Sequence, residues 1–288
     1  MTKRILCLHG RGTSGQIFKS QTASFRYKLD PTSTTYTFDF LDAPHQCPPG
    51  PDIKLFYSPP YYTFYPFDPV SSHSSITDIR ACHAWLDGIF SSREPYDGVM
   101  CFSQGCAVIS SYLLYRNWER PGEQVPFKWA MFICGGCPLN VLDDLGIDVG
   151  KKAWEIDEAT RLGLAEKVAA LEASLETGED RWATPASTTG SAKGVLEGLD
   201  PDAEVNPRDV CGLDTTKLGD MRITIPTVHV YGGRDPRWPA SLQLAYLCDG
   251  GVRKVWNHGG GHDVPRGKEV SETLAGLVEW VVGMGEMV

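Results

Sequence analysis

Short apolar runs alternate with helix-like segments along most of this chain, and this alternation restricts the possible folds more than any other feature. The run KRILCL, for example, is typical of a short buried strand. The runs expected to form strands are 3–8, 35–41, 97–102, 127–133, 227–231 and 252–256. Strands that alternate with helices pair in parallel, so the pattern predicts an α/β fold in which a mostly parallel sheet is flanked by helices.

The segments between these runs carry helical signals. In the segment 75–90, Ile79, Cys82 and Leu86 fall on one helix face, and Ser75 suits an N-terminal cap. The other expected helices are 17–29, 104–116, 156–177, 240–247 and 268–282.

The alternation is interrupted once. From about residue 138 to about residue 220 the chain has a charged helical run and a Gly/Ser/Thr/Pro-rich piece, but no strand-like run. We therefore expect a single domain over residues 1–288 that carries a lid-like insertion at about 138–220, since α/β folds of this length commonly form one unit.

Charge and hydropathy exclude several classes of partner. The formal net charge is −9, and basic residues never follow one another in more than a pair, whereas nucleic acids and anionic membranes require clustered Lys and Arg. No stretch approaches the roughly 18 consecutive apolar residues of a membrane span, and the N-terminus lacks the apolar core of a signal peptide. We expect a soluble, cytoplasmic protein with no nucleic-acid or membrane partner.

The nine cysteines form an odd set without a repeating spacing, which favours buried free thiols over a disulfide framework. Cys134-Gly-Gly-Cys137 matches C-x-x-C and leaves open a redox pair or half of a zinc site. The second metal-spaced pair is missing, so the motif is better explained as a strand end that turns on two glycines. We expect neither a metal nor another cofactor.

Four turns follow expected strands: HGRGTSG at 9–15, CFSQGC at 101–106, GGRDP at 232–236 and GGGHD at 259–263. Because the carboxyl ends of parallel strands share one edge of a sheet, these turns should meet there.

The turn CFSQGC differs by one residue from G-x-S-x-G, the motif that exposes a nucleophilic serine on a sharp strand-to-helix turn. Ser103 is the candidate nucleophile, and Cys101 replaces the first glycine. The alternative is that Ser103 is only a helix N-cap. Partners in the other turns decide between the two.

Acyl transfer by serine requires a base and a carboxylate that orients the base. His262 is the candidate base, and Asp235 is the candidate carboxylate. The order Ser103, Asp235, His262 along the chain is the order found in α/β-hydrolases. Asp263 is an alternative carboxylate, although it adjoins His262 and should point away from it. His258 and His262 are also spaced four apart like a metal pair, but three glycines between them make a helix improbable.

An oxyanion hole of this architecture combines the backbone N–H after the nucleophile with one from an early loop. The candidates are Gln104 and Arg11. His9, two residues before Arg11, is better explained as a structural residue of that loop than as the base.

A loop rich in aromatic residues and proline, 55–69, precedes the expected helix at 75–90. It either packs onto the body through its own rings or walls an apolar pocket above Ser103. We expect the second arrangement, with Tyr61, Tyr62 and Phe64 as substrate-binding residues.

The stretches ILCLHGRGTSG, FDFLDAPH, CFSQGCA, GGRDP and GGGHDVP together resemble the fungal serine hydrolase (FSH) family of α/β-hydrolases. The resemblance implies an α/β-hydrolase fold, a triad of Ser103, Asp235 and His262, and hydrolysis of acyl thioesters or esters. It also implies an acyl substrate that is a small molecule or is bound to a carrier protein, released or edited beside a fungal polyketide synthase. Two alternatives stay open: a carboxylesterase acting on a small secondary metabolite, and a catalytically idle hydrolase fold used for binding.

Overall fold

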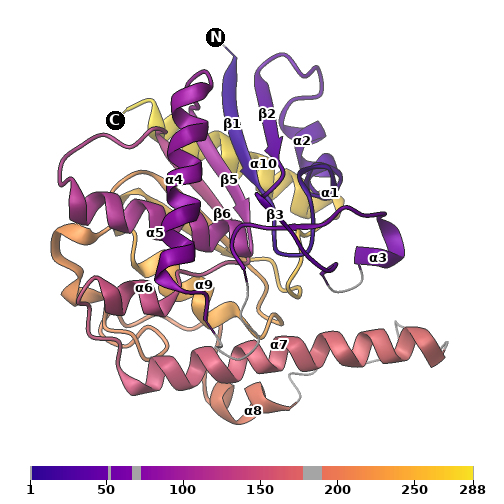
Figure 1. Ribbon diagram of the computed structural model, residues 1–288, viewed down its shortest axis with the longest axis vertical. Coiled ribbons are helices and arrows are strands. Elements are labelled where there is room, and N and C mark those ends of the chain that lie inside the picture. The colour runs from indigo at the N-terminus through magenta and orange to yellow at the C-terminus, as the bar shows by residue number, and fades with distance from the viewer. Residues whose placement is uncertain (1, 51–52, 67–72, 178–189, 288) are drawn as a thin grey trace.

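The computed structural model describes residues 2–50, 53–66, 73–177 and 190–287 (Figure 1). Its main sheet has six strands in the order β2-β1-β5-β6-β7-β8, and every pair of neighbours is parallel. The strands are β1 (Lys3–Leu8), β2 (Tyr36–Leu41), β5 (Gly98–Phe102), β6 (Trp129–Ile133), β7 (Thr227–Tyr231) and β8 (Arg253–Asn257). The expected parallel sheet is confirmed.

Helices cover both faces of this sheet, because side chains that alternate along each strand enter two different cores. Ile5 and Cys7 of β1 pack with α1 (Gly15–Gln21), α2 (Ala23–Leu29) and α10 (Lys268–Gly285). On the other face, Leu6 and Leu8 belong to a core that includes residues of α4 (Ile76–Ser92), α5 (Gln104–Glu119) and α6 (Leu139–Asp144). Burial on both faces explains why these strands are continuous apolar runs.

The insertion is helical in its described part. Between β6 and β7 lie α6, α7 (Lys151–Thr177), α8 (Ser191–Leu196) and the 3₁₀ segment η1 (Thr215–Met221). In Figure 1, α7 crosses the end of the molecule toward which the sheet strands run. Ile156 of α7 packs with Tyr231, Trp238 and Leu242 in a third small core, which joins the insertion to β7 and to α9 (Trp238–Tyr246).

Some elements differ from the expected bounds. The helix expected at 17–29 is two helices, because Thr22 turns its hydroxyl back to the carbonyl of Phe18 (2.8 Å) and caps α1 there. The segment between β2 and α4, for which the sequence predicts neither strand nor helix, contains α3 (Ile53–Phe56) and a small antiparallel pair, β3 (His45–Gln46) with β4 (Tyr62–Thr63). A last 3₁₀ turn, η2 (Gly250–Val252), precedes β8.

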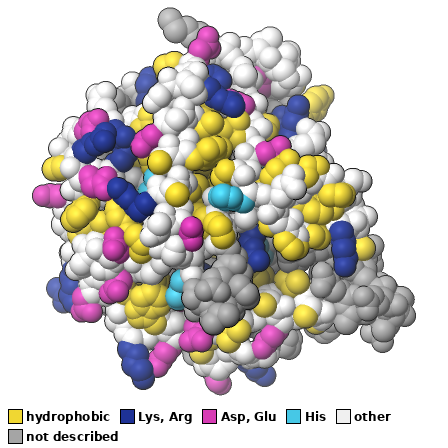
Figure 2. Space-filling view, viewed as in Figure 1, with side chains coloured by type: hydrophobic (Ala, Val, Ile, Leu, Met, Phe, Trp, Pro, Cys, Tyr) yellow, Lys and Arg dark blue, Asp and Glu magenta, His cyan; other side chains and the backbone are white. Residues whose placement is uncertain are grey.

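No helix within the described ranges is both long and apolar enough to cross a membrane. On the face shown in Figure 2, acidic and basic side chains of the described residues are interspersed.

Candidate active site

Ser103 occupies the tight turn between β5 and α5. Its backbone has φ 49° and ψ −112°, a conformation that is sparsely populated for residues other than glycine and is therefore strained. Two residues later, a Cβ on Gly105 would lie 2.5 Å from the carbonyl oxygen of Leu8, so only glycine fits there. Cys101, which replaces the first glycine of the usual motif, is buried and directs its thiol to the carbonyl of Met131 (3.4 Å). The substitution is accommodated without opening the turn.

The structure brings together the three side chains assigned to the triad. Nε2 of His262 lies 2.9 Å from Oγ of Ser103, and Nδ1 of His262 lies 2.7 Å from Oδ2 of Asp235. Ser103 follows β5, Asp235 follows β7 and His262 follows β8, so all three sit at the carboxyl edge of the sheet. Asp263, the alternative carboxylate, is exposed and is not the partner of the imidazole.

The hydrogen bonds define the protonation pattern of this group. The carboxylate of Asp235 is fully buried, and its second oxygen accepts the backbone N–H of Arg237 at 2.8 Å. An ionised carboxylate only accepts, so the proton on His262 belongs on Nδ1. Nε2 is then the acceptor that faces the hydroxyl of Ser103, which is the orientation a general base requires.

His9 is a fixed structural residue of the loop after β1. Its Nε2 accepts the backbone N–H of Ala43 (3.1 Å), so its proton lies on Nδ1, 2.7 Å from the carbonyl of Gly10. Burial lowers the pKa of His9 to about 4, which keeps the ring neutral at physiological pH. Thr13 also donates to the carbonyl of Gly10 (2.6 Å), and the loop is thereby held rigid beside the serine.

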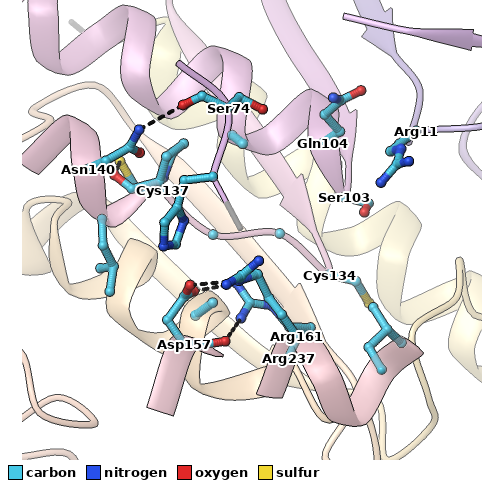
Figure 3. Close-up of a pocket in the computed structure, with 18 of the residues that line it drawn as sticks. Arg11, Ser74, Ser103, Gln104, Cys134, Cys137, Asn140, Asp157, Arg161 and Arg237 are labelled. Atoms are coloured by element: carbon cyan, nitrogen blue, oxygen red, sulfur yellow. Dashed lines mark hydrogen bonds and ion pairs between the residues drawn. The ribbon is translucent and has the colours of Figure 1, made fainter. Parts of the chain in front are cut away.

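Arg11 and Gln104, the two candidates for the oxyanion hole, lie with Ser103 on the wall of one cavity (Figure 3). Gln104 is the first residue of α5, where a backbone N–H has no acceptor within the helix. The side-chain amide of Gln104 is directed away, to Thr63 and to the backbone N–H of Phe64 (3.1 Å). The side chain of Gln104 therefore secures the aromatic loop and is not directed at the serine.

The cavity has a volume of about 250 Å³. Ser103 and Arg11 line one part of it, and a charged cluster of Asp157, Arg161 and Arg237 lines another (Figure 3). His262 is also among the lining residues. Its apolar wall consists of Tyr65, Ile79, Ala107, Pro138, Leu139, Leu164 and Ala240. The cavity thus combines an apolar surface with guanidinium groups.

The structure corrects the assignment of the aromatic loop. Tyr61, Tyr62 and Phe64 are not among the residues that line the cavity, whereas Tyr65 is. Phe64 is completely buried beside Trp85, and the hydroxyl of Tyr61 is bound to the carbonyl of Tyr57 at 2.6 Å. The loop packs onto the body through these rings, and the expected arrangement, in which they wall the pocket above Ser103, is wrong for these three residues. The part of it at 67–69 lies outside the described residues.

Tyr62 has a different role, through its backbone. Its carbonyl accepts the N–H of Gly12 (2.9 Å), and its own N–H donates to Thr13 (2.7 Å). β4 therefore braces the loop that carries Arg11.

Cys134 and Cys137 are both free, buried thiols, and burial raises the pKa of each above its usual value. Cys134 starts the turn after β6 with φ 48° and directs its thiol to the carbonyl of Asp263 (3.4 Å). In the described residues, no three His, Cys, Asp or Glu side chains are grouped as metal ligands.

Three residues of the site were not anticipated from the sequence. Asp157 and Arg161 belong to α7. Arg237 lies two residues after Asp235, at the start of α9. Asp157 and Arg161 carry a weak signal, an acid and a base four apart in a helical run. Such a pair is more often on the surface.

A serine, a histidine and a buried carboxylate at the carboxyl edge of a parallel sheet define this protein as a serine hydrolase of the α/β-hydrolase fold. Residues 1–274 match the family described as "Serine hydrolase (FSH1)", and the chain belongs to that family.

The relatives agree with this class, and one solved structure agrees with the fold. The chain is 30% identical over 287 residues to "Esterase alnB" of Emericella nidulans, covering 97% of this chain and 96% of that protein. It is 28% identical over 254 residues to "Serine hydrolase cnsH" of Penicillium expansum, covering 84% of this chain and 97% of that protein. The crystal structure of esterase PE8 superposes with a TM-score of 0.50 at 15% identity, over 97% of this chain and 93% of that one, and supports the fold alone.

Proposed function

We propose that this enzyme cleaves an acyl thioester or ester through a covalent acyl-enzyme on Ser103. The observation that carries the proposal is the continuous chain of short contacts from Asp235 through His262 to Ser103. Oγ of Ser103 attacks the acyl carbonyl carbon while its proton passes to Nε2 of His262. Asp235 stabilises the imidazolium that forms.

Breakdown of the tetrahedral intermediate and hydrolysis of the acyl-enzyme use the same three side chains. The tetrahedral intermediate collapses, the bond from carbon to sulfur or oxygen breaks, and His262 returns its proton to the leaving atom. Water then attacks the acyl-enzyme with His262 again as base, and Ser103 is regenerated. The backbone N–H groups of Gln104 and Arg11 stabilise the oxyanion, a contribution that typically amounts to ~10²–10³ in rate for one donor.

For the acyl group we propose a polyketide chain, carried by a synthase or its carrier protein. The mixed lining of the cavity supports this, because a partly reduced polyketide has apolar carbons for the wall of Tyr65, Leu139 and Leu164 and carbonyl or hydroxyl oxygens for the guanidiniums. The similarity to esterases and hydrolases from Emericella, Penicillium and Fusarium is consistent with it.

A carboxylesterase acting on a small secondary metabolite is the second candidate. It is favoured by the relatives named as esterases, among them "Esterase FPY3" of Fusarium mangiferae (26% identical, 97% of this chain and 96% of that protein). A catalytically idle fold has less support, since the three side chains are already aligned.

The two enzymatic candidates differ in the leaving group, so the test holds the acyl group constant. A β-ketoacyl chain is offered on the phosphopantetheine arm of a carrier protein, as the free N-acetylcysteamine thioester, and as the ethyl ester. Release of a polyketide predicts the highest kcat/KM for the carrier-bound thioester. A higher kcat/KM for the ester than for both thioesters would instead establish the carboxylesterase.

A further inference from the structure

We propose that Asp157 of α7 is a positioning residue for catalysis, which acts through Arg237 to hold the triad carboxylate Asp235 against His262. The inference rests on the proposed function of the triad. It gives α7 of the insertion a role in positioning the triad, in addition to the roles of the three triad residues.

Arg237 is fixed from α7 by three hydrogen bonds of one guanidinium. Its Nη2 donates to Oδ1 of Asp157 at 2.8 Å, and its Nη1 donates to the backbone carbonyl of Asp157 (2.8 Å) and to Oγ1 of Thr160 (2.9 Å). A planar fork held at three points has one orientation. The side chain of Arg237 therefore locks its own backbone to α7.

Asp157 is itself held firmly. It is only 8% exposed, and its second oxygen accepts Nε of Arg161, one turn along α7, at 3.0 Å. Burial alone would raise the pKa of Asp157, but the guanidiniums of Arg237 and Arg161 outweigh it and lower the pKa below the usual value. The carboxylate is thus ionised and paired on both oxygens.

The backbone of Arg237 passes this restraint to the triad. Its N–H donates to Oδ1 of Asp235 at 2.8 Å, while Oδ2 of the same carboxylate receives Nδ1 of His262 at 2.7 Å. The two oxygens of Asp235 therefore bind one fixed donor and one catalytic donor. Any rotation of Arg237 would move the oxygen that faces His262.

A second contact joins α7 to the same loop. Nζ of Lys167 donates to the carbonyl of Arg234 (3.1 Å), the residue before Asp235. Arg234 in turn binds the histidine loop, through its N–H to Gly260 (2.9 Å) and its Nε to Gly259 (2.7 Å). α7 is therefore coupled to both loops that carry the base and its carboxylate.

The test uses Asp157→Asn, which keeps the size of the side chain and removes its charge. We expect kcat to fall about 10- to 100-fold, the order of loss caused by a small misplacement of catalytic groups. KM should change less than about threefold, and the acid limb of the kcat/KM pH profile should move to lower pH, because an imidazolium with a displaced carboxylate loses its proton more easily.

Two further variants and a control separate positioning from folding. Arg237→Lys keeps the backbone N–H and a positive charge but loses the planar guanidinium, so it should also lower kcat and shift the pH profile. Asp157→Glu restores the carboxylate, so its kcat and its pH profile should lie between those of Asp157→Asn and the wild type. The control is Asp209→Asn, which removes an exposed ion pair between Asp209 and Lys152 of α7 (2.7 Å). It should leave kcat and the profile unchanged, and near-ultraviolet circular dichroism verifies that each variant is folded.

A folded Asp157→Asn or Arg237→Lys protein with the wild-type kcat and pH profile overturns the proposal. So does a loss that appears only as a higher KM with an unmoved acid limb, because that result identifies a contact with substrate. Failure of the triad itself is recognised separately, by turnover that persists in Ser103→Ala in the same assay.

Discussion

Oγ of Ser103 lies 2.9 Å from Nε2 of His262, although 159 residues separate them along the chain. The contact is possible because β5 and β8 both end at the carboxyl edge of one parallel sheet, so the turns that follow them lie at the same edge although β6 and β7 separate the two strands. Ser103 is held toward the imidazole by a strained backbone, with φ 49°. Gly105, two residues later, packs closely against the end of β1.

The triad predicts strongly non-additive kinetics. Ser103→Ala and His262→Ala should each lower kcat by several orders of magnitude, and the double variant should be hardly slower than either single one, since the groups act as a unit. Steady-state kinetics on a nitrophenyl ester measures all three. Losses that multiply would mean that the two residues act independently.

Gly105→Ala should damage both stability and turnover. The added Cβ would lie 2.5 Å from the oxygen and 2.9 Å from the carbon of the Leu8 carbonyl, and backbone atoms cannot move aside cheaply. We expect a loss of about 1–3 kcal/mol in the free energy of unfolding, together with a lower kcat.

Gly88→Ala is the matched control, because Gly88 lies inside α4 and a Cβ there meets nothing within 4 Å. It should raise the free energy of unfolding by about 0.5–1 kcal/mol. Urea titration of both variants decides the matter; equal stabilities would show that the close approach at Gly105 is unimportant.

Three buried histidines should make the fold sensitive to acid. Burial lowers the pKa of His9 to about 4 and those of His83 and His229 to about 3, below the usual value near 6.5. Below about pH 6.5 these three histidines therefore bind protons in the unfolded chain but stay neutral in the folded chain, until the pH approaches their lowered pKa values. The stabilisation is fully present above pH 6.5 and is lost as the pH falls from there toward the folded pKa values, by on the order of 2 kcal/mol per histidine down to about pH 4.5.

His83→Gln should accordingly flatten the dependence of unfolding free energy on pH between about 6.5 and 4.5. His45→Gln, which changes an exposed histidine, should leave the slope as in the wild type. The measurement is urea unfolding at several pH values. An unchanged slope in His83→Gln would show that this histidine does not titrate as its burial requires.

The cavity predicts a preference for medium acyl chains over acetyl. Each methylene buried against its apolar wall is worth ~0.8 kcal/mol, so kcat/KM should rise severalfold per carbon until the cavity is full. The cavity volume of about 250 Å³ is near the lower end of the range for ligand pockets, so the rise of kcat/KM with acyl-chain length should stop at a short chain.

Leu164→Ala should reduce this slope, since Leu164 lines the cavity, whereas Leu162→Ala on the exposed side of α7 should not. An acyl-thioester series from two to ten carbons measures both. If acetyl is cleaved as fast as hexanoyl, the apolar wall does not contact the acyl chain.

The sequence was most informative where local rules and tertiary structure agree. Strands buried on both faces must be apolar throughout, so they can be recognised in the sequence as continuous apolar runs. The serine turn requires a small residue where Gly105 meets Leu8, so it can be recognised by its glycine. The order of turns on a parallel sheet predicted that Ser103, Asp235 and His262 would meet, and the three side chains are in contact.

The failures share a different cause. Tyr61, Tyr62 and Phe64 lie in a proline-rich loop, where side-chain direction has no period and the sequence does not indicate which rings face the cavity and which enter the core. Asp157 and Arg237 are 80 residues apart, so their contact could not be predicted without the packing of α7 on the sheet edge. The pair Asp157 and Arg161 by itself looks like an ordinary surface pair.

Labelling with a fluorophosphonate is the most direct test that Ser103 is an activated nucleophile, because the reagent phosphonylates a serine whose hydroxyl proton is removed by a neighbouring base. The wild-type protein should gain the mass of one adduct, located on the peptide that contains Ser103. His262→Ala should label far more slowly, and Ser103→Ala should not label. A folded wild-type protein that gains no adduct, or one that is labelled equally well after Ser103→Ala, would contradict the account.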